Sequence, residues 1–432
     1  MASTCAYNDQ LIEIRRHLHT MPEEGWSEFR TTAFIIETLR SYGYEVLTGK
    51  KVINPDNCLG RSQKVVDAGI AYAREHGVSE ELLAEMDGLT GCVGVLDTGR
   101  PGPTLAVRFD IDCVPVTEST DADHIPAKEG FASTRPGLMH ACGHDCHISM
   151  LLTAGKILND LRDRLSGTVV LCFQPAEEVG KGAAAMIADG ALEGVDAAFG
   201  IHVWSDVPTG HVAVRTGPMM AAGDEFEIEV FGKAGHGAMP HCCADATLMA
   251  SAIALNLQTI VSRETDPIDT AVVTVGMLNS GTRFNVISGY AKLIGTTRCF
   301  KPEIRARFPE QLERIAKETA RAMNGDAKLT YNALIPPTFN DADMAERVRV
   351  AAKKLLGENA LYDYPPSMGG EDFANYQEKV PGAMCFLGVR NEACGAVYAQ
   401  HHNCYQVDEA MLVKGALLHA QMAVDYLGLE CQ

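Results

Sequence analysis

Apolar residues recur at helical spacing near the start of the chain and predict two amphipathic helices. Three apolar residues share one face of each helix: Leu11, Ile14 and Leu18 in the first, and Phe34, Ile35 and Leu39 in the second. Gly43 is expected to end the second helix. Residues 52–88 are polar with two periodic pieces, VVDAGIAYAREHG and SEELLAEM, and are predicted to form a helical insertion.

Farther along the chain, short apolar runs alternate with helical patterns. Residues 92–110 contain two apolar runs separated by Gly and Pro, which predicts a hairpin-like pair of strands. GTVVLCF and DAAFGIHVW are predicted strands, and KGAAAMIADGAL between them is a predicted short helix. This alternation is typical of an α/β domain with a mainly parallel sheet.

Residues 220–333 follow a different order of elements. The predicted strand FEIEVFG is followed by a helix, two strands, a long helix and the last strand KLTYNAL. The order β-α-β-β-α-β is that of a ferredoxin-like, split βαβ sandwich. We therefore expect an inserted α+β domain at 220–333, within an α/β domain formed by residues 1–219 and 334–432.

Composition and charge exclude several classes of protein. The chain has 432 residues, of which 46% are hydrophobic, so a globular protein is expected. Lys and Arg number 37 and Asp and Glu 56, which gives a net charge of −19 and argues against nucleic acid or an anionic membrane as partner. The 14 Cys are scattered and the start lacks a signal-like apolar run, so a reduced, cytoplasmic location is expected.

Four segments are rich in the side chains that bind metal ions. They are residues 139–147 (MHACGHDCH), 174–178 (QPAEE), 200–204 (GIHVW) and 400–403 (QHHN). In the first, Cys142 and His144 stand just before a predicted helix, and both side-chain types suit zinc or a similar divalent ion. A structural loop with incidental His is the alternative, which five Cys and His within eight positions disfavour.

Each of the other three segments alone is weak evidence for a metal site, but together they are strong evidence. Glu177 and Glu178 follow a predicted strand, where open α/β sheets place their sites, and adjacent side chains diverge, so one can bind metal while the other faces a water molecule. A solvated acidic turn is the alternative. His202 alone is typical of a core residue, and the pair His401–His402 does not specify a ligand by itself.

The motifs HACGHDCH, FQPAEE, GIHVW, GHGAMPH and GTRFNVI resemble those of the M20 metallopeptidases. More narrowly, they resemble the amidohydrolases of that family that use a Cys ligand, among them hippurate hydrolases, N-acetyl-diaminopimelate deacetylases and auxin-conjugate hydrolases. The insertion after residue 51 and the segment LDTGRPGP also resemble the p-aminobenzoyl-glutamate hydrolase A subunit. The first resemblance spans essentially the whole chain.

The resemblance implies a catalytic domain interrupted by a lid and dimerisation domain, and two divalent metal ions. Zinc or manganese is expected, with nickel or cobalt as alternatives. The implied ligands are Cys142, His144, Glu178, His202 and His401. The residue His402 remains an alternative to His401, because the segment HHNCYQVDE departs from the family pattern. Glu177 is implied to be the general base.

The lid is expected to supply further residues. His236 resembles the histidine that stabilises the oxyanion, in many members from the partner subunit of a homodimer, and Asn285 resembles the residue that holds the substrate carboxylate. Arg298 is a candidate bidentate partner for a carboxylate. The alternatives are that His236 is a turn histidine, that Asn285 caps a turn, and that Arg298 is a solvated strand residue. Asp110 and Asp112 are interpreted as structural or as supporting the ligands.

Asp145 is a candidate to orient a ligand imidazole, and Cys146, His147, Trp204, Met219 and Met220 are interpreted mainly as core or pocket wall. The substrate expected from the resemblance is an N-acyl or N-aroyl amino acid, with p-aminobenzoyl-glutamate as the best single guess. Other N-acyl amino acids or dipeptides are alternatives. A cysteine hydrolase with Cys142 as nucleophile, and a non-catalytic partner subunit that works with a related second chain, are the competing hypotheses.

Overall fold

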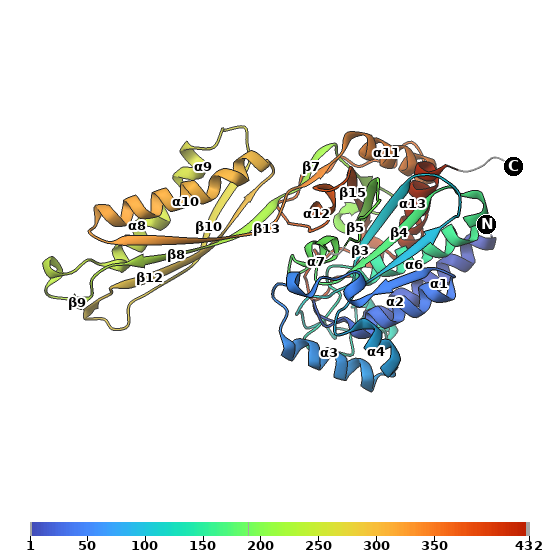
Figure 1. Ribbon diagram of the computed structural model, residues 1–432, viewed down its shortest axis with the longest axis horizontal. Coiled ribbons are helices and arrows are strands. Elements are labelled where there is room, and N and C mark those ends of the chain that lie inside the picture. The colour runs from blue at the N-terminus through green and yellow to red at the C-terminus, as the bar shows by residue number, and fades with distance from the viewer. Residues whose placement is uncertain (1, 189, 429–432) are drawn as a thin grey trace. The chain divides into compact units, whose positions relative to one another are not determined.

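The computed structural model describes residues 2–188 and 190–428, and the chain divides into two compact units (Figure 1). The first unit comprises Met1–Met219, Phe339–Pro365 and Asp372–Gln432. The second comprises Met220–Thr338 with Pro366–Glu371. Each unit has its own cluster of buried apolar side chains, so each has a separate hydrophobic core.

The first unit is built on a seven-stranded sheet in the order β1-β2-β4-β3-β5-β15-β6. Its four central strands, β4, β3, β5 and β15, run parallel, whereas β1, β2 and β6 join antiparallel at the two sides. The strands are β1 (Glu45–Thr48), β2 (Cys92–Asp97), β3 (Thr104–Asp110), β4 (Thr168–Gln174), β5 (Ala197–Pro208), β6 (Val212–Ala213) and β15 (Gly382–Arg390). The expected α/β class with a mainly parallel sheet is confirmed.

The hairpin predicted for residues 92–110 is wrong. Strands β2 and β3 both form, but β4 lies between them, antiparallel to β2 and parallel to β3. The reason is burial: six of the seven residues of β4 are buried, on both faces, and such a strand is most stable with a neighbour on each side. The turn residues between β2 and β3 therefore belong to a connection and not to a hairpin.

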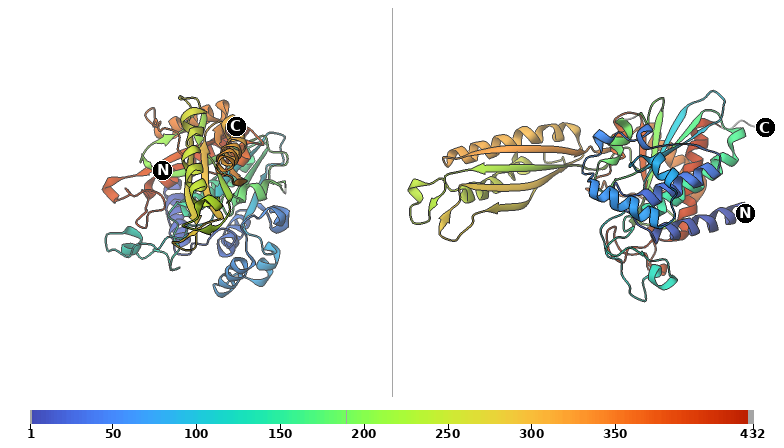
Figure 2. Two further views of the ribbon diagram at one scale, coloured as in Figure 1. Left: turned by 90° about the vertical axis from the view of Figure 1, so that its left-hand side faces the viewer. Right: turned by 60° about the horizontal axis from the view of Figure 1, so that its bottom comes forward.

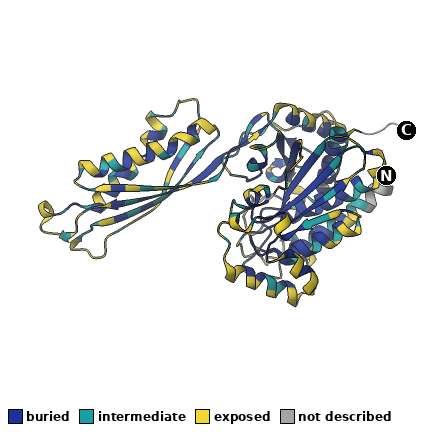
Figure 3. Ribbon diagram, viewed as in Figure 1, coloured by how far each residue is buried: buried dark blue, intermediate teal, exposed yellow. Residues whose placement is uncertain are grey.

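Helices cover both faces of this sheet. Helix α6 packs against β3 and against α1 and α13, α11 packs against α13 and β15, and α7 and α12 pack against each other (Figure 1). Figure 3 shows that the central strands are buried along their length. The helices are α1 (Ala2–His19), α2 (Phe29–Ser41), α5 (Ile125–Glu129), α6 (His144–Asp160), α7 (Gly182–Ala188), α11 (Ala342–Leu356), α12 (Ala374–Gln377) and α13 (Leu412–Leu427).

The insertion predicted at 52–88 contains two helices, α3 (Gln63–Glu75) and α4 (Glu80–Met86). Each begins at a serine cap: the Ser62 hydroxyl accepts a hydrogen bond from the Val65 N–H, and the Ser79 hydroxyl accepts one from the Leu82 N–H. Helix α3 packs on α2 through buried Val66, so the insertion is a fixed part of the first unit.

The second unit has the expected ferredoxin-like order of elements. Its sheet, β10-β12-β8-β13, is antiparallel throughout, and α8 and α10 pack on it and on each other (Figure 2). Phe226, Ile228 and Val230 alternate inward along β8. The elements are β8 (Ala222–Phe231), β9 (Gly235–His236), α8 (Ala246–Asn256), α9 (Thr259–Arg263), β10 (Ala271–Ser280), β11 (Val286–Ile287), β12 (Tyr290–Cys299), α10 (Pro302–Ala322) and β13 (Asp326–Ile335).

Two short strands, β7 (Gly217–Met220) and β14 (Thr338–Asn340), complete the strands of the described chain. No helix among the described residues is both long and apolar enough to cross a membrane.

Candidate metal centre

The parallel strands bring two of the four motif segments, 174–178 and 200–204, to one edge of the first unit's sheet. Asp110 at the end of β3 is paired with Gln174 at the end of β4, and Arg108 of β3 is paired with Gly200 of β5. Glu177 and Glu178 follow β4, and His202 lies on β5 just beyond that level. This edge is where open α/β sheets place their sites.

The first motif reaches the same place through the start of α6. Gly143 has a left-handed φ of 94°, and a Cβ at this position would lie 2.4 Å from Cγ2 of Val203. Glycine therefore lets the chain pass close to β5, with Cys142 on one side and His144 on the other. The fourth segment joins through the His401 N–H, which donates a 2.8 Å hydrogen bond to the Ala141 carbonyl.

The five predicted ligands gather in one cluster. Cys142 Sγ lies 3.4 Å from His202 Nε2, and Glu178 Oε1 lies 3.8 Å from His144 Nε2 and 3.2 Å from His401 Nε2. Ligand atoms lie within 4.8 Å of one another in three overlapping groups: Cys142, His144 and His202; Cys142, Glu178 and His401; and His144, Glu177 and Glu178. The structure places His401 in this cluster, whereas His402 stacks on Tyr398.

Two residues of the cluster's loops adopt strained backbone conformations. Ala176 has a φ of 56° and His401 a φ of 64°, both in the left-handed region that non-glycine residues avoid at a cost of about 1–3 kcal/mol. Carboxylates hold the first loop in place: Glu28 Oε1 accepts from the Ala176 N–H at 2.8 Å, and Asp112 Oδ2 accepts from the Glu178 N–H at 2.9 Å. Such strain clusters where a loop must aim particular side chains.

The imidazoles of His144 and His202 are oriented by their Nδ1 atoms. His144 Nδ1 lies 3.2 Å from Asp112 Oδ1, and His202 Nδ1 donates to the Val203 carbonyl at 2.6 Å. Both Nε2 atoms therefore face the cluster. His144 Nε2 is buried and has no hydrogen-bond partner among the described residues. A buried orphan nitrogen beside Cys, His and Glu ligands fits a bound metal ion.

The family model described as Peptidase family M20/M25/M40 matches residues 106–425. The chain belongs to this family. It is similar to an IAA-amino acid hydrolase ILR1-like 2 of Arabidopsis thaliana, with 38% identity over 424 residues, 97% of this chain and 85% of that protein. The resemblance that the sequence motifs predicted is confirmed.

Two solved structures extend the comparison. One is the YXEP protein of Bacillus subtilis, described as a dinuclear metal binding peptidase from the M20 family, with TM-score 0.78, 32% identity, and 98% of this chain and 99% of that one covered. The other is an aminobenzoyl-glutamate utilization protein from Klebsiella pneumoniae, with TM-score 0.71, 25% identity, and 99% and 97% covered. This M20 chain is therefore a metal-dependent hydrolase of the amidohydrolase type.

The carboxylates of this M20 site create a negative potential that favours a bound cation. Burial lowers the pKa of His144, but the carboxylates of Asp110, Asp112 and Glu178 outweigh it and raise that pKa to about 10. The proton on His144 thus supplies positive charge that the surrounding carboxylates require. A divalent metal ion held by these ligands would supply the same charge in place of the proton.

The thiol of Cys142 also lies where a nearby positive charge would be stabilising. Burial, reinforced by the carboxylates of Glu178 and Glu177, raises the pKa of its thiol well above the ordinary value. A cysteine nucleophile requires the opposite shift, so the cysteine-hydrolase hypothesis loses its support. A metal ion would instead stabilise the thiolate directly.

Three neighbours of the ligands have structural contacts of their own. His147 Nδ1 lies 2.5 Å from Asp110 Oδ1, and His147 Nε2 accepts from the Val203 N–H at 3.0 Å, so both ring nitrogens are engaged. Arg108 donates to Asp110 and to the Gln174 amide oxygen. Asp110 therefore contacts both His147 and Arg108, and its carboxylate also lies within 4.8 Å of ring nitrogens of His144 and His147.

The expectation that Asp145 orients a ligand imidazole is wrong. Its Oδ2 lies 2.7 Å from His19 Nδ1 and 3.0 Å from Arg15 Nε. The first turn of α6 directs Asp145 toward α1, while His144, one residue earlier, faces the sheet edge, because successive helical residues point about 100° apart. Asp112, from the loop after β3, takes the orienting position beside His144 instead.

Glu177, the predicted general base, is buried, with 8% of its surface exposed, and lies in the group with His144 and Glu178. Trp204 stacks on Phe386 with ring centroids 4.1 Å apart and meets the His202 ring edge-on at 5.4 Å. Trp204 is thus a wall beside the cluster, as expected.

The second unit carries the other predicted site residues. His236 on β9 is exposed and pairs with Val286 of β11, next to exposed Asn285. Arg298 lies near the far end of β12, opposite Gly223 of β8. Arg298 lies eight residues of extended strand from Tyr290, a distance of ~26 Å, and Asn285 lies in the connection before Tyr290, so the two residues of one chain lie toward opposite ends of this sheet.

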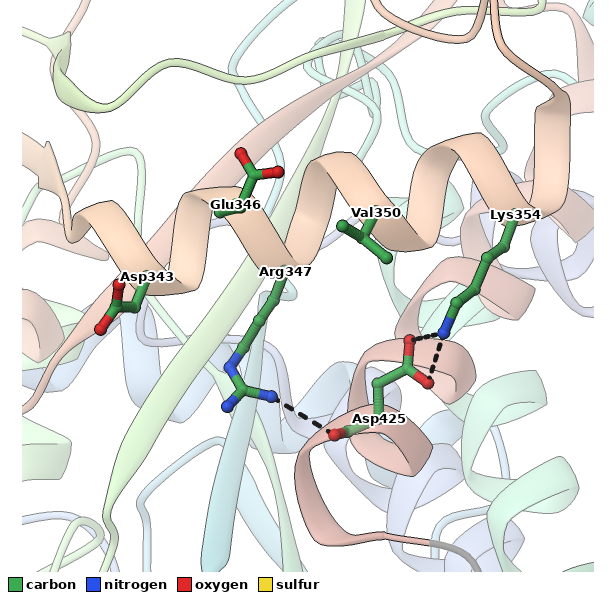
Figure 4. Close-up of a pocket in the computed structure, with 6 residues that line it drawn as sticks. All are labelled: Asp343, Glu346, Arg347, Val350, Lys354 and Asp425. Atoms are coloured by element: carbon green, nitrogen blue, oxygen red, sulfur yellow. Dashed lines mark hydrogen bonds and ion pairs between the residues drawn. The ribbon is translucent and has the colours of Figure 1, made fainter.

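A separate hollow of about 470 Å³ on the first unit contains none of the candidate metal ligands. It is formed by α11 and α13, where Lys354 Nζ lies 2.7 Å from Asp425 Oδ2 and Arg347 donates to the Asp425 carbonyl (Figure 4). None of the predicted site residues lines it. The contacts of Lys354 and Arg347 with Asp425 link the two helices at this hollow.

Proposed function

We propose that this M20 hydrolase cleaves the amide bond of an N-acyl or N-aroyl amino acid. The observation that carries the proposal is the cluster of Cys142, His144, Glu178, His202 and His401 with buried Glu177 beside it. The likeness to an IAA-amino acid hydrolase supports an amino acid amide as the substrate class. The likeness to an aminobenzoyl-glutamate utilization protein and the insertion at 52–88 support p-aminobenzoyl-glutamate as the first substrate to test.

Two divalent ions, zinc or manganese, are proposed for the five ligands; when bound, they would polarise the scissile carbonyl and lower the pKa of a water molecule. Glu177 accepts the proton of that water as it attacks the carbonyl carbon. The same carboxyl then donates the proton to the leaving nitrogen as the C–N bond breaks, which releases the acid and the amino acid. Asp112 keeps His144 in the orientation that this arrangement needs.

The second unit is proposed to complete the site from a partner subunit. His236 would donate a hydrogen bond to the oxyanion, and Asn285 and Arg298 would hold the substrate carboxylate. Arg298 lies ~26 Å along β12 from Tyr290, and Asn285 lies in the connection before Tyr290. A single second unit therefore cannot present both to one small ligand, whereas a homodimer can. A homodimer is therefore proposed over a monomer.

The surface of the second unit supports such a dimer. Leu248 and Leu255 on α8 are 60% and 74% exposed, and β10, with exposed Met277 and Leu278, is an edge strand of its sheet. Exposed apolar residues beside an unpaired strand edge are typical of an interface.

The test is release of p-aminobenzoate from p-aminobenzoyl-glutamate by the manganese-loaded chain. Release that falls by about 10²–10⁴ in Glu177→Gln, with bound metal unchanged, would support both the reaction and the role of Glu177. A wild-type chain that hydrolyses neither this substrate nor a panel of N-acyl amino acids would contradict the proposal. Activity that appears on addition of a related second chain would favour the two-subunit alternative.

A further inference from the structure

A cavity of about 620 Å³ lies in the first unit beside the candidate ligands Glu178 and His401. Its lining is largely apolar. The apolar side chains are those of Trp26, Val65, Val114, Pro115, Val116 and Val179. A cavity of this size and character is typical of a small-molecule site.

Trp26 lines this cavity and has a strained backbone conformation. Its φ is 67°, in the left-handed region, and 2% of its surface is exposed. Its indole Nε1–H donates a 3.1 Å hydrogen bond to the carbonyl of Leu59 in the insertion. A bulky residue held in this conformation by a hydrogen bond is a feature that cavities and ligand sites accumulate.

The segment around Trp26 also lies against the candidate catalytic loop. A Cβ on Gly25 would lie 3.1 Å from the Ala176 Cα and 3.4 Å from Asp112 Oδ2. The cavity wall and the loop that carries Glu177 and Glu178 are therefore in direct contact. A group bound in the cavity would be continuous with one at the metal ligands.

Part of the cavity wall comes from the insertion, through Gly60, Arg61, Ser62 and Val65. Arg61 Nη2 donates to the Gly88 carbonyl at 2.7 Å, and Ser62 caps α3. The first bond ties the segment before α3 to the end of the insertion. Val65 and Val179 nevertheless remain 37% and 47% exposed, which leaves apolar surface at the cavity without a covering side chain.

We propose that this cavity binds the acyl part of the substrate, that the preferred acyl group is the size of an aromatic ring, and that Val65 of the insertion sets the size limit. The inference rests on the proposed amide hydrolysis and names the part of the substrate that the insertion recognises. An acetyl group would leave most of the cavity's apolar surface uncovered, whereas a benzoyl group would bury the exposed surface of Val65 and Val179 together.

The experiment compares Val65→Trp, which fills the cavity, with Lys64→Trp, a matched change at the neighbouring exposed position of α3. kcat/KM is measured for N-acetyl-glutamate and N-benzoyl-glutamate. The wild type is expected to prefer the benzoyl substrate by at least tenfold. Val65→Trp is expected to lose at least tenfold on the benzoyl substrate and less than twofold on the acetyl one, and Lys64→Trp to change neither.

Binding of benzoate, measured by titration calorimetry, tests the cavity without turnover. Val65→Trp is expected to weaken benzoate binding at least tenfold, and Lys64→Trp to leave it unchanged. Equal effects of Val65→Trp on both substrates, or unaltered benzoate binding, would overturn the inference. If no amide is hydrolysed and benzoate binding still depends on Val65, the proposed function fails and the cavity assignment stands.

Discussion

At the scale of single residues, the hydrogen-bond partners of the two ring nitrogens distinguish a candidate metal ligand from a neighbouring structural histidine. His144 and His147 stand in one motif and both are buried. His147 has both nitrogens engaged, by Asp110 and by the Val203 N–H, whereas His144 Nε2 has no hydrogen-bond partner among the described residues. These contacts agree with the choice of His144, and not His147, as the predicted ligand.

Glu118 provides a residue-scale prediction of pH dependence. Its side chain accepts from the ring nitrogens of His19 and His124 at 2.9 and 2.8 Å. Burial raises its pKa, but these histidines outweigh burial and lower the pKa to about 2 from an ordinary value of 4.5. The folded-state pKa is depressed, so the stabilisation is complete above about pH 4.5 and is lost as the pH falls through about 2.

The expected size of this effect is about 3 kcal/mol at neutral pH, of which about half is lost by pH 3. Glu118→Gln should therefore destabilise the first unit at pH 6 by about that amount, and by roughly half as much at pH 3. Denaturant unfolding followed by tryptophan fluorescence measures this, because Trp26 and Trp204 both lie in the first unit. A difference between variant and wild type that does not change with pH would contradict the prediction.

At the scale of elements, periodicity identified the strands and helices, but pairing required the whole sheet. The apolar runs of β2 and β3 are adjacent in sequence, with turn residues between them, which is the usual signal of a hairpin. The insertion of β4 between them follows from a long-range preference, because β4 is buried on both faces. In the second unit the pairing follows the expected ferredoxin-like order, and the central strand β8 alternates between buried and more open positions along most of its length.

Helix α8 supplies the element-scale prediction. Leu248 and Leu255 are seven residues apart on one exposed face. The double variant Leu248→Glu/Leu255→Glu should convert the proposed dimer to a monomer, because charge repulsion and lost apolar burial act together. Sedimentation velocity measures the change. Activity should fall with dimer content if His236 acts in trans.

Val350→Glu is the matched control, since Val350 is an exposed valine on α11 of the first unit. It should leave the oligomeric state unchanged. A wild-type chain that is already monomeric and fully active would contradict the dimer proposal. A dimer that persists in the α8 double variant would show that another surface forms the interface.

At the scale of the whole molecule, the two units have separate cores, and the five predicted ligands belong to the first unit alone. Metal binding should therefore stabilise the first unit specifically. A metal ion at 100 times its dissociation constant adds about 2.7 kcal/mol to the unit that binds it.

Chelation should accordingly lower the unfolding temperature reported by tryptophan fluorescence, and a second calorimetric transition from the other unit should not move. In Cys142→Ala, which lacks one ligand, the shift on chelation should be much smaller. A chelator that leaves both transitions in place would count against a resident metal in the first unit. Movement of both transitions would show that the units unfold together.

The sequence by itself determined the class of each unit, the family and the side chains of the cluster. Local pattern carries that information: period 3.6 or 2 in the apolar positions, and Cys, His and Glu in short ordered motifs. The fold class is confirmed, and the tertiary structure gathers the five residues chosen as ligands. Their roles remain predictions that the metal and activity measurements test.

Tertiary structure alone decided what depends on distant contacts. It placed β4 between β2 and β3, turned Asp145 toward His19 while Asp112 took its place beside His144, and brought His401 and not His402 to Glu178. It also set the insertion against Trp26 to form a cavity. Each of these outcomes is fixed by packing between segments far apart in sequence, and no local pattern carries that information.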